Sequence, residues 1–219
     1  FSIDPVIIRI IRNRNVEGEE AIFRYLYGTK EDMYSPWLFK DMEQAVAILM
    51  QKIEEQKKIR IIGDYDADGV NSSCILLRGL KRCGARVDCE IPHRMLDGYG
   101  INERLIEEAY KAGIDTILTC DNGIAAMKQT EFAKQMGLTV IITDHHDIPY
   151  QETEKERKYQ VPPADAVINA KQQDCPYPFK GLCGAGVAYK VVQALYEKLG
   201  IPEEELFGLL EFAAVATIG

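Results

Sequence analysis

Hydrophobic residues change their spacing along the chain near residue 59. In residues 1–58 they recur at helical intervals, in three separate stretches. From residue 59 onward, short apolar runs rich in β-branched residues alternate with amphipathic segments of helical period. The pattern predicts a helical amino-terminal segment, residues 1–58, packed on a second part, residues 59–219, that is built from alternating strands and helices.

Five apolar runs in the second part predict β-strands, at residues 59–62, 86–91, 116–120, 138–143 and 166–168. Helices are expected at 70–84, 102–112, 124–136 and 187–199, with a last helix from Pro202 onward and a charged surface loop at 152–158. Alternation at this spacing indicates an α/β fold, with a mostly parallel sheet of about five strands and helices on both faces.

Acidic and imidazole side chains follow three of these predicted strands. Asp64, Asp66 and Asp68 follow the first strand, Asp121 follows the third, and the fourth is followed by Asp144, His145 and His146. Parallel strands present their carboxyl ends at one edge of the sheet, where ligands bind in open α/β folds. Carboxylates gathered so closely repel one another unless a cation lies between them. The sequence therefore predicts a metal site at this edge.

The ligand types favour manganese or magnesium. An oxygen-rich set with one or two imidazoles suits these ions better than zinc or copper. Two such ions, bridged by a carboxylate, drive in-line hydrolysis of phosphoesters without a serine or cysteine nucleophile. The six cysteines form no Cys-x-x-Cys pair, so we expect reduced thiols and no zinc site.

The first acidic stretch also matches other motifs. Its start resembles an EF-hand loop, but the twelfth position of that loop is Ile75 rather than glutamate, which excludes calcium-sensor chemistry. The run from Asp66 to Val70 resembles the signature of haloacid-dehalogenase-like phosphatases, with Asp66 as nucleophile and Asp68 as acid/base. A solvated acidic turn without function is the remaining alternative.

The charge and hydropathy of the chain limit the classes of partner that it can bind. A net charge of −8 argues against indiscriminate nucleic-acid binding, although a local basic groove is compatible with it. The sequence contains no apolar run of membrane-spanning length and no signal peptide. We expect a cytoplasmic protein that does not bind membranes.

The ordered motifs resemble the DHH phosphoesterase family. They are Asp64-Tyr65-Asp66-Ala67-Asp68-Gly69, then Asp121, then Asp144-His145-His146. Within that family, residues 91–94 and 175–188 are similar to the RecJ-type exonucleases specific for single-stranded DNA. The resemblance covers nearly the whole chain. One departure is Ile62, which stands where some members carry a histidine that belongs to the first motif.

The resemblance implies a role for each motif residue. The expected metal ligands are Asp64, Asp66, Asp68, Asp121 and His145, with Asp121 as the bridge between two ions. His146 is expected to contact the scissile phosphate or a metal, and Asp144 to hold an imidazole in one tautomer.

Two further segments are candidates for holding substrate. His93 and Arg94 lie in a glycine-bearing loop at the same edge, where Arg94 is suited to gripping a phosphate. Gly184 and Gly186 precede a helix, so their backbone N–H groups are candidates for a phosphate cradle. The alternatives are a solvated charge for Arg94 and close helix packing for the two glycines.

The function that the resemblance implies is 5′→3′ exonuclease action on single-stranded DNA, in repair and recombination, with helicases or single-strand-binding proteins as candidate partners. The alternatives are a DHH phosphodiesterase for short oligonucleotides or cyclic dinucleotides, and a non-catalytic strand-binding module. In such exonucleases the stretch corresponding to 207–218 runs into a further aspartate ligand and an accessory domain. We therefore expect this chain to be a catalytic fragment that is weakly active or inactive alone.

Overall fold

The computed structural model describes residues 3–95, 98, 100–152 and 156–218. The chain divides into two compact units, Phe1–Ser35 and Pro36–Gly219. The first contains α1 (Pro5–Arg12), α2 (Glu19–Tyr27) and a 3-10 turn, Lys30–Asp32. It holds none of the candidate site residues, which all lie in the second unit.

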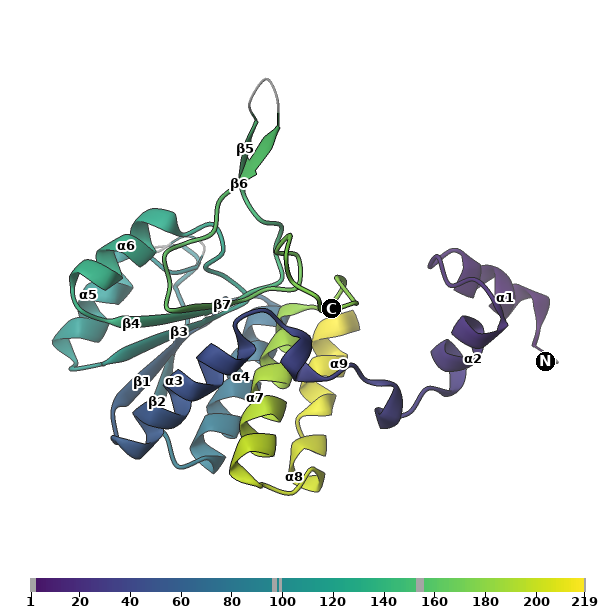
Figure 1. Ribbon diagram of the computed structural model, residues 1–219, viewed down its shortest axis with the longest axis horizontal. Helices are drawn as coiled ribbons and strands as arrows, with labels where there is room; N and C mark the ends of the chain where they lie inside the picture. Colours follow the sequence, from purple (N-terminus) through teal and green to yellow (C-terminus); the bar gives the residue numbers. More distant parts are fainter. Residues whose placement is uncertain (1–2, 96–97, 99, 153–155, 219) are drawn as a thin grey trace. The chain divides into compact units, whose positions relative to one another are not determined.

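The second unit is built on a five-stranded parallel sheet (Figure 1). Its strands are β1 (Lys58–Ile62), β2 (Arg86–Glu90), β3 (Thr116–Cys120), β4 (Thr139–Thr143) and β7 (Ala166–Ile168), in the order β2-β1-β3-β4-β7. The chain extends the sheet from β1 to β2 on one side and then resumes with β3 on the other side of β1. The order therefore reverses between β1 and β3, and such a switch point is where open α/β sheets bind ligands.

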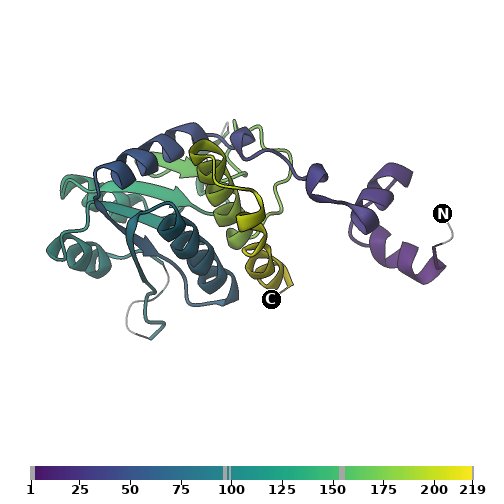
Figure 2. The same ribbon diagram turned by 90° about the horizontal axis from the view of Figure 1, so that it is seen from below.

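Helices cover both faces of this sheet, as the sequence predicts. On one face lie α3 (Met42–Glu54), α4 (Ala67–Arg82), α7 (Gly184–Leu199) and α9 (Leu210–Ile218), which Figure 2 shows in front of the sheet, coloured from dark blue to yellow. The other face packs on α5 (Glu103–Lys111) and α6 (Met127–Gln135).

Alternate residues of β1, β3, β4 and β7 supply the two cores. In β1, Ile61 joins the core under α4 and α7, whereas its neighbour Ile62 joins the core under α5 and α6. Side chains of a strand point to opposite faces, so a strand covered on both sides is mostly apolar. Every residue of β3 is buried, which explains why this strand was predicted with its correct limits.

The two longest helices of this unit, α4 and α7, pack closely. A Cβ atom added at Gly79 of α4 would lie 2.5 Å from Cγ2 of Val192 on α7. Only glycine allows the two helix backbones to approach this far.

Two expectations were wrong. The predicted charged loop contains a short antiparallel hairpin, β5 (Tyr150–Glu152) and β6 (Arg157–Tyr159), whose tip at 153–155 lies outside the described residues. The hairpin is polar and lacks the alternation of apolar and polar residues that predicts a strand. The predicted last helix is two helices, α8 (Glu204–Phe207) and α9. The helix stops at Gly208, because glycine has poor helix propensity. In the described part of the chain, no helix has the length and apolar character needed to cross a membrane.

Candidate metal centre

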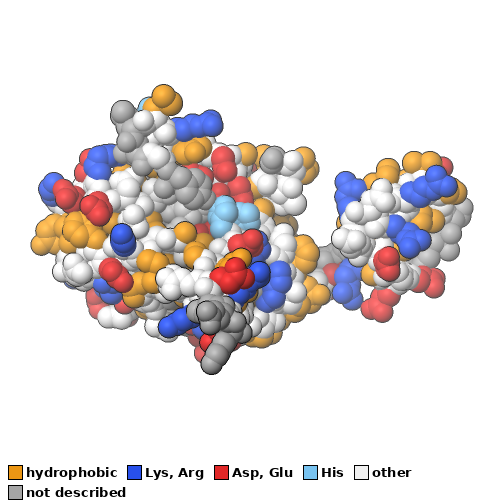
Figure 3. Space-filling view, turned by 90° about the horizontal axis from the view of Figure 1, so that it is seen from above, with side chains coloured by type: hydrophobic (Ala, Val, Ile, Leu, Met, Phe, Trp, Pro, Cys, Tyr) orange, Lys and Arg blue, Asp and Glu red, His pale blue; other side chains and the backbone are white. Residues whose placement is uncertain are grey.

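The loops that follow β1, β3 and β4 bring the candidate ligands to the carboxyl edge of the sheet. Seen from above, the pale-blue histidines lie near the middle of this face, beside red carboxylates (Figure 3). Two sets of side chains each place one ligand-type atom within 4.8 Å of the others, Asp64 with Asp66 and Asp121, and Asp121 with His145 and His146. Asp121 belongs to both sets, which is the arrangement required of a carboxylate that bridges two metal ions.

Asp121 occupies an unusual position directly after β3. Its backbone is left-handed, with φ of 60°, a conformation that aspartate tolerates better than most residues. Its N–H donates to the carbonyl of Thr143, and its Oδ1 lies 3.0 Å from His145 Nε2. Burial raises the pKa of Asp121 to about 6, although His145 acts in the opposite direction. The negative charge of Asp121 is therefore poorly solvated by the surrounding protein.

Asp64 is the second buried carboxylate, 1% exposed. Its Oδ1 accepts no hydrogen bond from the residues that the structure describes, and burial raises its pKa. Gly69 makes room for it, because a Cβ atom at residue 69 would lie 2.5 Å from Asp64 Cβ. A buried carboxylate oxygen without a donor is costly unless another group supplies the missing charge. The donor set therefore fits a hard divalent cation such as Mn²⁺ or Mg²⁺.

Asp66 and Asp68 begin α4 and are held by backbone donors. Asp66 Oδ1 accepts the N–H of Gly69 at 2.9 Å and so caps the helix. Asp68 lies outside both ligand sets, and its oxygens accept the N–H groups of Gly184, at 2.6 Å, and Ala185, at 2.7 Å. Its Oδ2 also lies 3.4 Å from His145 Nε2.

The same contacts occupy the predicted phosphate cradle. The N–H of Gly184 donates to Asp68 Oδ2, and the N–H of Gly186 donates to Cys183 Sγ at 3.4 Å. Gly184 has a steric role as well, since a Cβ atom there would lie 2.7 Å from Asp121 Oδ1. The start of α7 therefore binds a side chain of the protein at the candidate phosphate cradle, and the close packing of Gly184 agrees with the alternative given for the two glycines.

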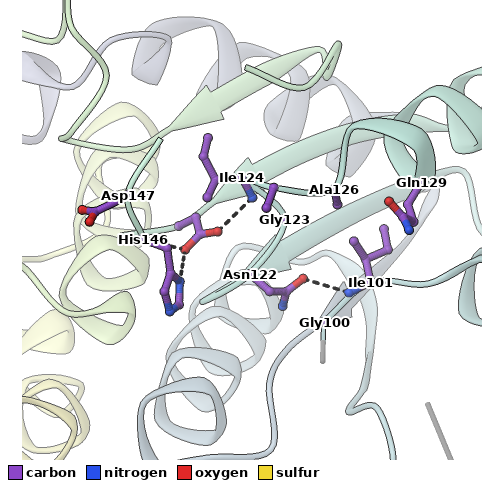
Figure 4. Close-up of a pocket in the computed structure, with 11 residues that line it drawn as sticks. Gly100, Ile101, Asn122, Gly123, Ile124, Ala126, Gln129, His146 and Asp147 are labelled. Carbon is purple, nitrogen blue, oxygen red and sulfur yellow. Dashed lines mark hydrogen bonds and ion pairs between the residues drawn. The ribbon is translucent and has the colours of Figure 1, made fainter. Parts of the chain in front are cut away.

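The two histidines have different surroundings. His145 Nε2 faces Asp121, which raises the pKa of His145. Nδ1 of His146 lies 2.7 Å from Asp144 Oδ1 (Figure 4), and this contact raises the pKa of His146. Burial alone would raise the pKa of Asp144, but hydrogen bonds from His146 and the N–H of Ile124 hold it below its usual value. Asp144 thus orients the imidazole of His146, whereas Asp121 contacts the imidazole of His145.

His93 and Arg94 are exposed and lie outside the ligand sets. The guanidinium of Arg94 stacks 5.3 Å from the ring centre of Tyr65. Tyr65 lies between Asp64 and Asp66 in the sequence. His93 Nδ1 accepts the N–H of Met95 at 3.3 Å. The contact with Tyr65 brings a cation next to the acidic cluster without neutralising it.

Asn122 is a site residue that the sequence analysis missed. Its Nδ2 donates to the carbonyls of Ile62, Gly63 and Cys120 at 2.9–3.0 Å, and its Oδ1 accepts the N–H of Ile101 (Figure 4). It therefore ties together the ends of β1 and β3 and the loop before α5. The only signal in the sequence is its position between Asp121 and a glycine at a strand end.

A cavity of about 300 Å³ lies beside this centre. Asp144 lines it, His146 and Asp147 form one of its sides, and Ile101, Ile124 and Gln129 form others (Figure 4). The metal centre and an apolar hollow thus adjoin each other at the sheet edge.

A family model for the DHH family, N-terminal domain, matches residues 58–217. This chain belongs to the DHH family. The matched range contains every candidate ligand and begins with β1. Membership accounts for the Asp144-His145-His146 motif, which a dehalogenase-like phosphatase leaves unexplained.

Relatives of this DHH chain are named single-stranded-DNA-specific exonuclease RecJ. The Bacillus subtilis protein is 39% identical over 99% of this chain, and the Haemophilus influenzae protein is 34% identical over 98%. This chain spans 26% and 36% of the lengths of these two relatives.

Two solved structures resemble this DHH chain in fold. Exonuclease RecJ bound to manganese matches with a TM-score of 0.71 and 34% identity, over 85% of this chain and 44% of that one. RecJ from Thermus thermophilus in complex with Mn²⁺ matches with a TM-score of 0.67 and 30% identity, over 100% of this chain and 31% of that one.

Proposed function

We propose that this chain is the catalytic DHH part of a metal-dependent phosphodiesterase that degrades single-stranded DNA from its 5′ end. The observation that carries the proposal is the position of Asp121, which belongs to two adjoining ligand sets at the β1/β3 switch point. The RecJ relatives support the choice of substrate, and the RecJ structures with manganese support the choice of metal.

In this proposal Asp64, Asp66 and Asp121 hold one ion, and Asp121 and His145 hold a second. Asp68 remains a further candidate ligand, because each carboxylate oxygen retains a lone pair beyond the one that accepts a backbone N–H. Mn²⁺ or Mg²⁺ bound here would activate a water molecule and neutralise charge on the scissile phosphate.

The other side chains position the substrate. His146, whose Nδ1 is held by Asp144, offers Nε2 to a phosphate oxygen. Arg94, stacked on Tyr65, is suited to gripping a second phosphate, and His93 in the same loop is a further candidate. Neither role requires these side chains to ligate metal.

The cellular setting is part of the same proposal. We place the activity in DNA repair and recombination, in the cytoplasm, with a helicase or single-strand-binding protein as candidate partner. All six cysteines are free thiols, which supports a reducing compartment.

The test is hydrolysis by the purified chain with Mn²⁺ of four substrates: a 5′-phosphorylated single strand, the same strand as a duplex, a dinucleotide and a cyclic dinucleotide. Because the chain is expected to be a weakly active fragment, we expect slow mononucleotide release from the single strand, and no release by an Asp121→Asn variant. Exclusive hydrolysis of the dinucleotides would instead support a small-substrate enzyme. Equal activity of the variant and the wild type would refute the metal-centre assignment.

A further inference from the structure

A second cavity, of about 490 Å³, lies at the base of the β5–β6 hairpin. It is lined by hairpin residues and by the segments that follow β4 and β7, among them Tyr150, Arg157, Tyr159, Lys171 and Lys180. None of these residues belongs to the metal centre. The cavity therefore needs an explanation of its own.

Two tyrosines form one wall of this cavity. Tyr150 and Tyr159 pair directly across the hairpin, with ring centres 5.7 Å apart. A cross-strand aromatic pair stabilises a hairpin, and that role alone would explain their presence. However, the two residues remain 46% and 36% exposed, so the pairing leaves part of each ring open to solvent. Arg157 lies over the Tyr150 ring, 4.6 Å from its centre, and places a cation in the same wall.

The charge of the cavity is opposite to that of the whole chain. Its lining contains three cations, Arg157, Lys171 and Lys180, and one carboxylate, Asp147, whereas the chain carries a net charge of −8. Asp147 pairs with Lys171 at 2.8 Å, and Arg157 lies 3.5 Å from Glu152. Lys180 donates to two backbone carbonyls and, among the described residues, makes no ion pair. A positive charge thus remains for an anionic ligand.

Asp147 connects the two cavities of the carboxyl edge. It lines the cavity beside His146 and also the cavity beside the hairpin. Lys and Arg side chains gather next to the histidines on this face (Figure 3). The two cavities are therefore neighbours, and a polymer whose phosphate lies at His146 can extend past the ion pair of Asp147 and Lys171 toward the tyrosine pair.

We propose that the β5–β6 hairpin is a stacking platform for single-stranded nucleic acid, with Tyr150 and Tyr159 receiving a base of the strand whose scissile phosphate lies at the metal centre. Aromatic faces combined with unneutralised cations are the usual means of binding single strands without regard to sequence. The inference rests on the proposed function, because it extends the path of the same substrate.

Binding and hydrolysis are tested separately, so that failure of one inference is distinguishable from failure of the other. Binding is measured by fluorescence anisotropy in EDTA, with a labelled single strand of about eight nucleotides, a length typical of such sites. Three variants are compared with the wild type. Tyr150→Val/Tyr159→Val removes both ring faces but keeps strand propensity. Tyr150→Phe/Tyr159→Phe keeps the rings, and Tyr110→Leu removes an exposed tyrosine of α5 at the opposite edge of the sheet.

We expect the valine variant to raise the Kd for the strand by about tenfold or more, since base stacking is worth that much per base. The phenylalanine and Tyr110→Leu variants should bind like the wild type. With Mn²⁺, the valine variant should hydrolyse a dinucleotide at the wild-type kcat/KM, because that substrate is too short to reach the hairpin.

A photo-cross-linking measurement on the wild type tests the same contact without relying on correct folding of the valine variant. A strand carrying 5-iodouracil should cross-link in the wild type to a peptide that contains Tyr150 or Tyr159. Wild-type affinity in the valine variant, or cross-links confined to other segments, would overturn the inference and leave the tyrosines to the hairpin or to a protein partner. Absence of hydrolysis in the wild type would instead count against the proposed function.

Discussion

Asp68 and Gly184 meet across the domain: Asp68 Oδ2, in the first turn of α4, accepts the N–H at the start of α7 at 2.6 Å. Helix amino termini attract anions, because their first N–H groups are unpaired and the helix dipole is positive there. The contact joins segments 116 residues apart in sequence. It also brings Gly184 against Asp121, so that the start of α7 supports two carboxylates of the candidate metal centre.

The first prediction concerns the space at Gly184. In Gly184→Ala the new methyl group would meet Asp121 Oδ1 at 2.7 Å, so this carboxylate must move. We expect Mn²⁺ affinity, measured by calorimetry, to fall at least tenfold. Gly186→Ala is the matched control, because its methyl group meets only the flexible side chain of Leu182. Similar metal affinities in the two variants would show that Asp121 is not confined by α7.

Asn122 should be essential for stability. In Asn122→Ala three buried carbonyls lose their donor, and each unsatisfied buried group costs about 1–3 kcal/mol. We expect the free energy of unfolding, from urea titration without metal, to fall by about 3 kcal/mol. Gln129→Ala, on the neighbouring helix α6, should change it by less than about 0.5 kcal/mol. A small loss in Asn122→Ala would mean that water replaces the amide.

The two histidines should differ in their effects. His145 Nε2 lies 3.0 Å from Asp121 Oδ1, whereas His146 directs Nδ1 at Asp144. His145→Ala is therefore expected to weaken Mn²⁺ binding, and His146→Ala to lower turnover with little change in metal affinity. Calorimetry and single-strand hydrolysis measure the two quantities. Equal metal affinities of the two variants would contradict the assignment.

Metal removal provides a test of Asp121. Asparagine also tolerates the left-handed backbone, so Asp121→Asn removes the buried charge without adding strain. We expect this variant to be more stable than the wild type in EDTA. Mn²⁺ at a hundredfold excess over Kd should stabilise the wild type by about 2.7 kcal/mol and the variant hardly at all. Equal stabilisation by Mn²⁺ would place the ion elsewhere.

Lys190 gives a pH dependence that is independent of metal. It is 4% exposed in α7, and burial lowers its pKa from 10.5 to about 8, although Glu197 acts in the opposite direction. Between these values the unfolded chain binds more protons than the folded chain, so the contribution of Lys190 to stability rises with pH.

We expect this rise to reach at most about 3 kcal/mol by pH 10.5. Urea unfolding of the wild type and of Lys190→Met at pH 7 and pH 10 measures it. Relative to the wild type, the variant should be favoured most at pH 7 and progressively less as the pH increases. Parallel pH profiles of the two proteins would show that the Lys190 ammonium is well solvated or fully paired in the fold.

The sequence permitted prediction of those features that depend on local pattern. β1 and β3 are central strands whose buried positions are mostly apolar and β-branched, and the acidic residues after them are recognisable as strand-end groups. Asn122 and the contact between Asp68 and Gly184 depend on how distant segments approach one another, which no local spacing reveals. The strands of the β5–β6 hairpin were not predicted for another reason. Their residues are polar or aromatic, and they bury no alternating face.

The close approach of α4 and α7 at Gly79 sets the geometry of the centre from within the core. Val192 leaves no space for a side chain at residue 79, so neither helix can slide along the other without a clash. Asp68 and Gly184 sit at the starts of these same helices, and their contact is therefore fixed before any ion arrives. A substitution that touches neither ligand nor substrate, such as Gly79→Ala, would alter catalysis by misaligning the two helix ends. Surveys of inactivating changes in this domain should find them deep in this helix interface as well as among the acidic residues.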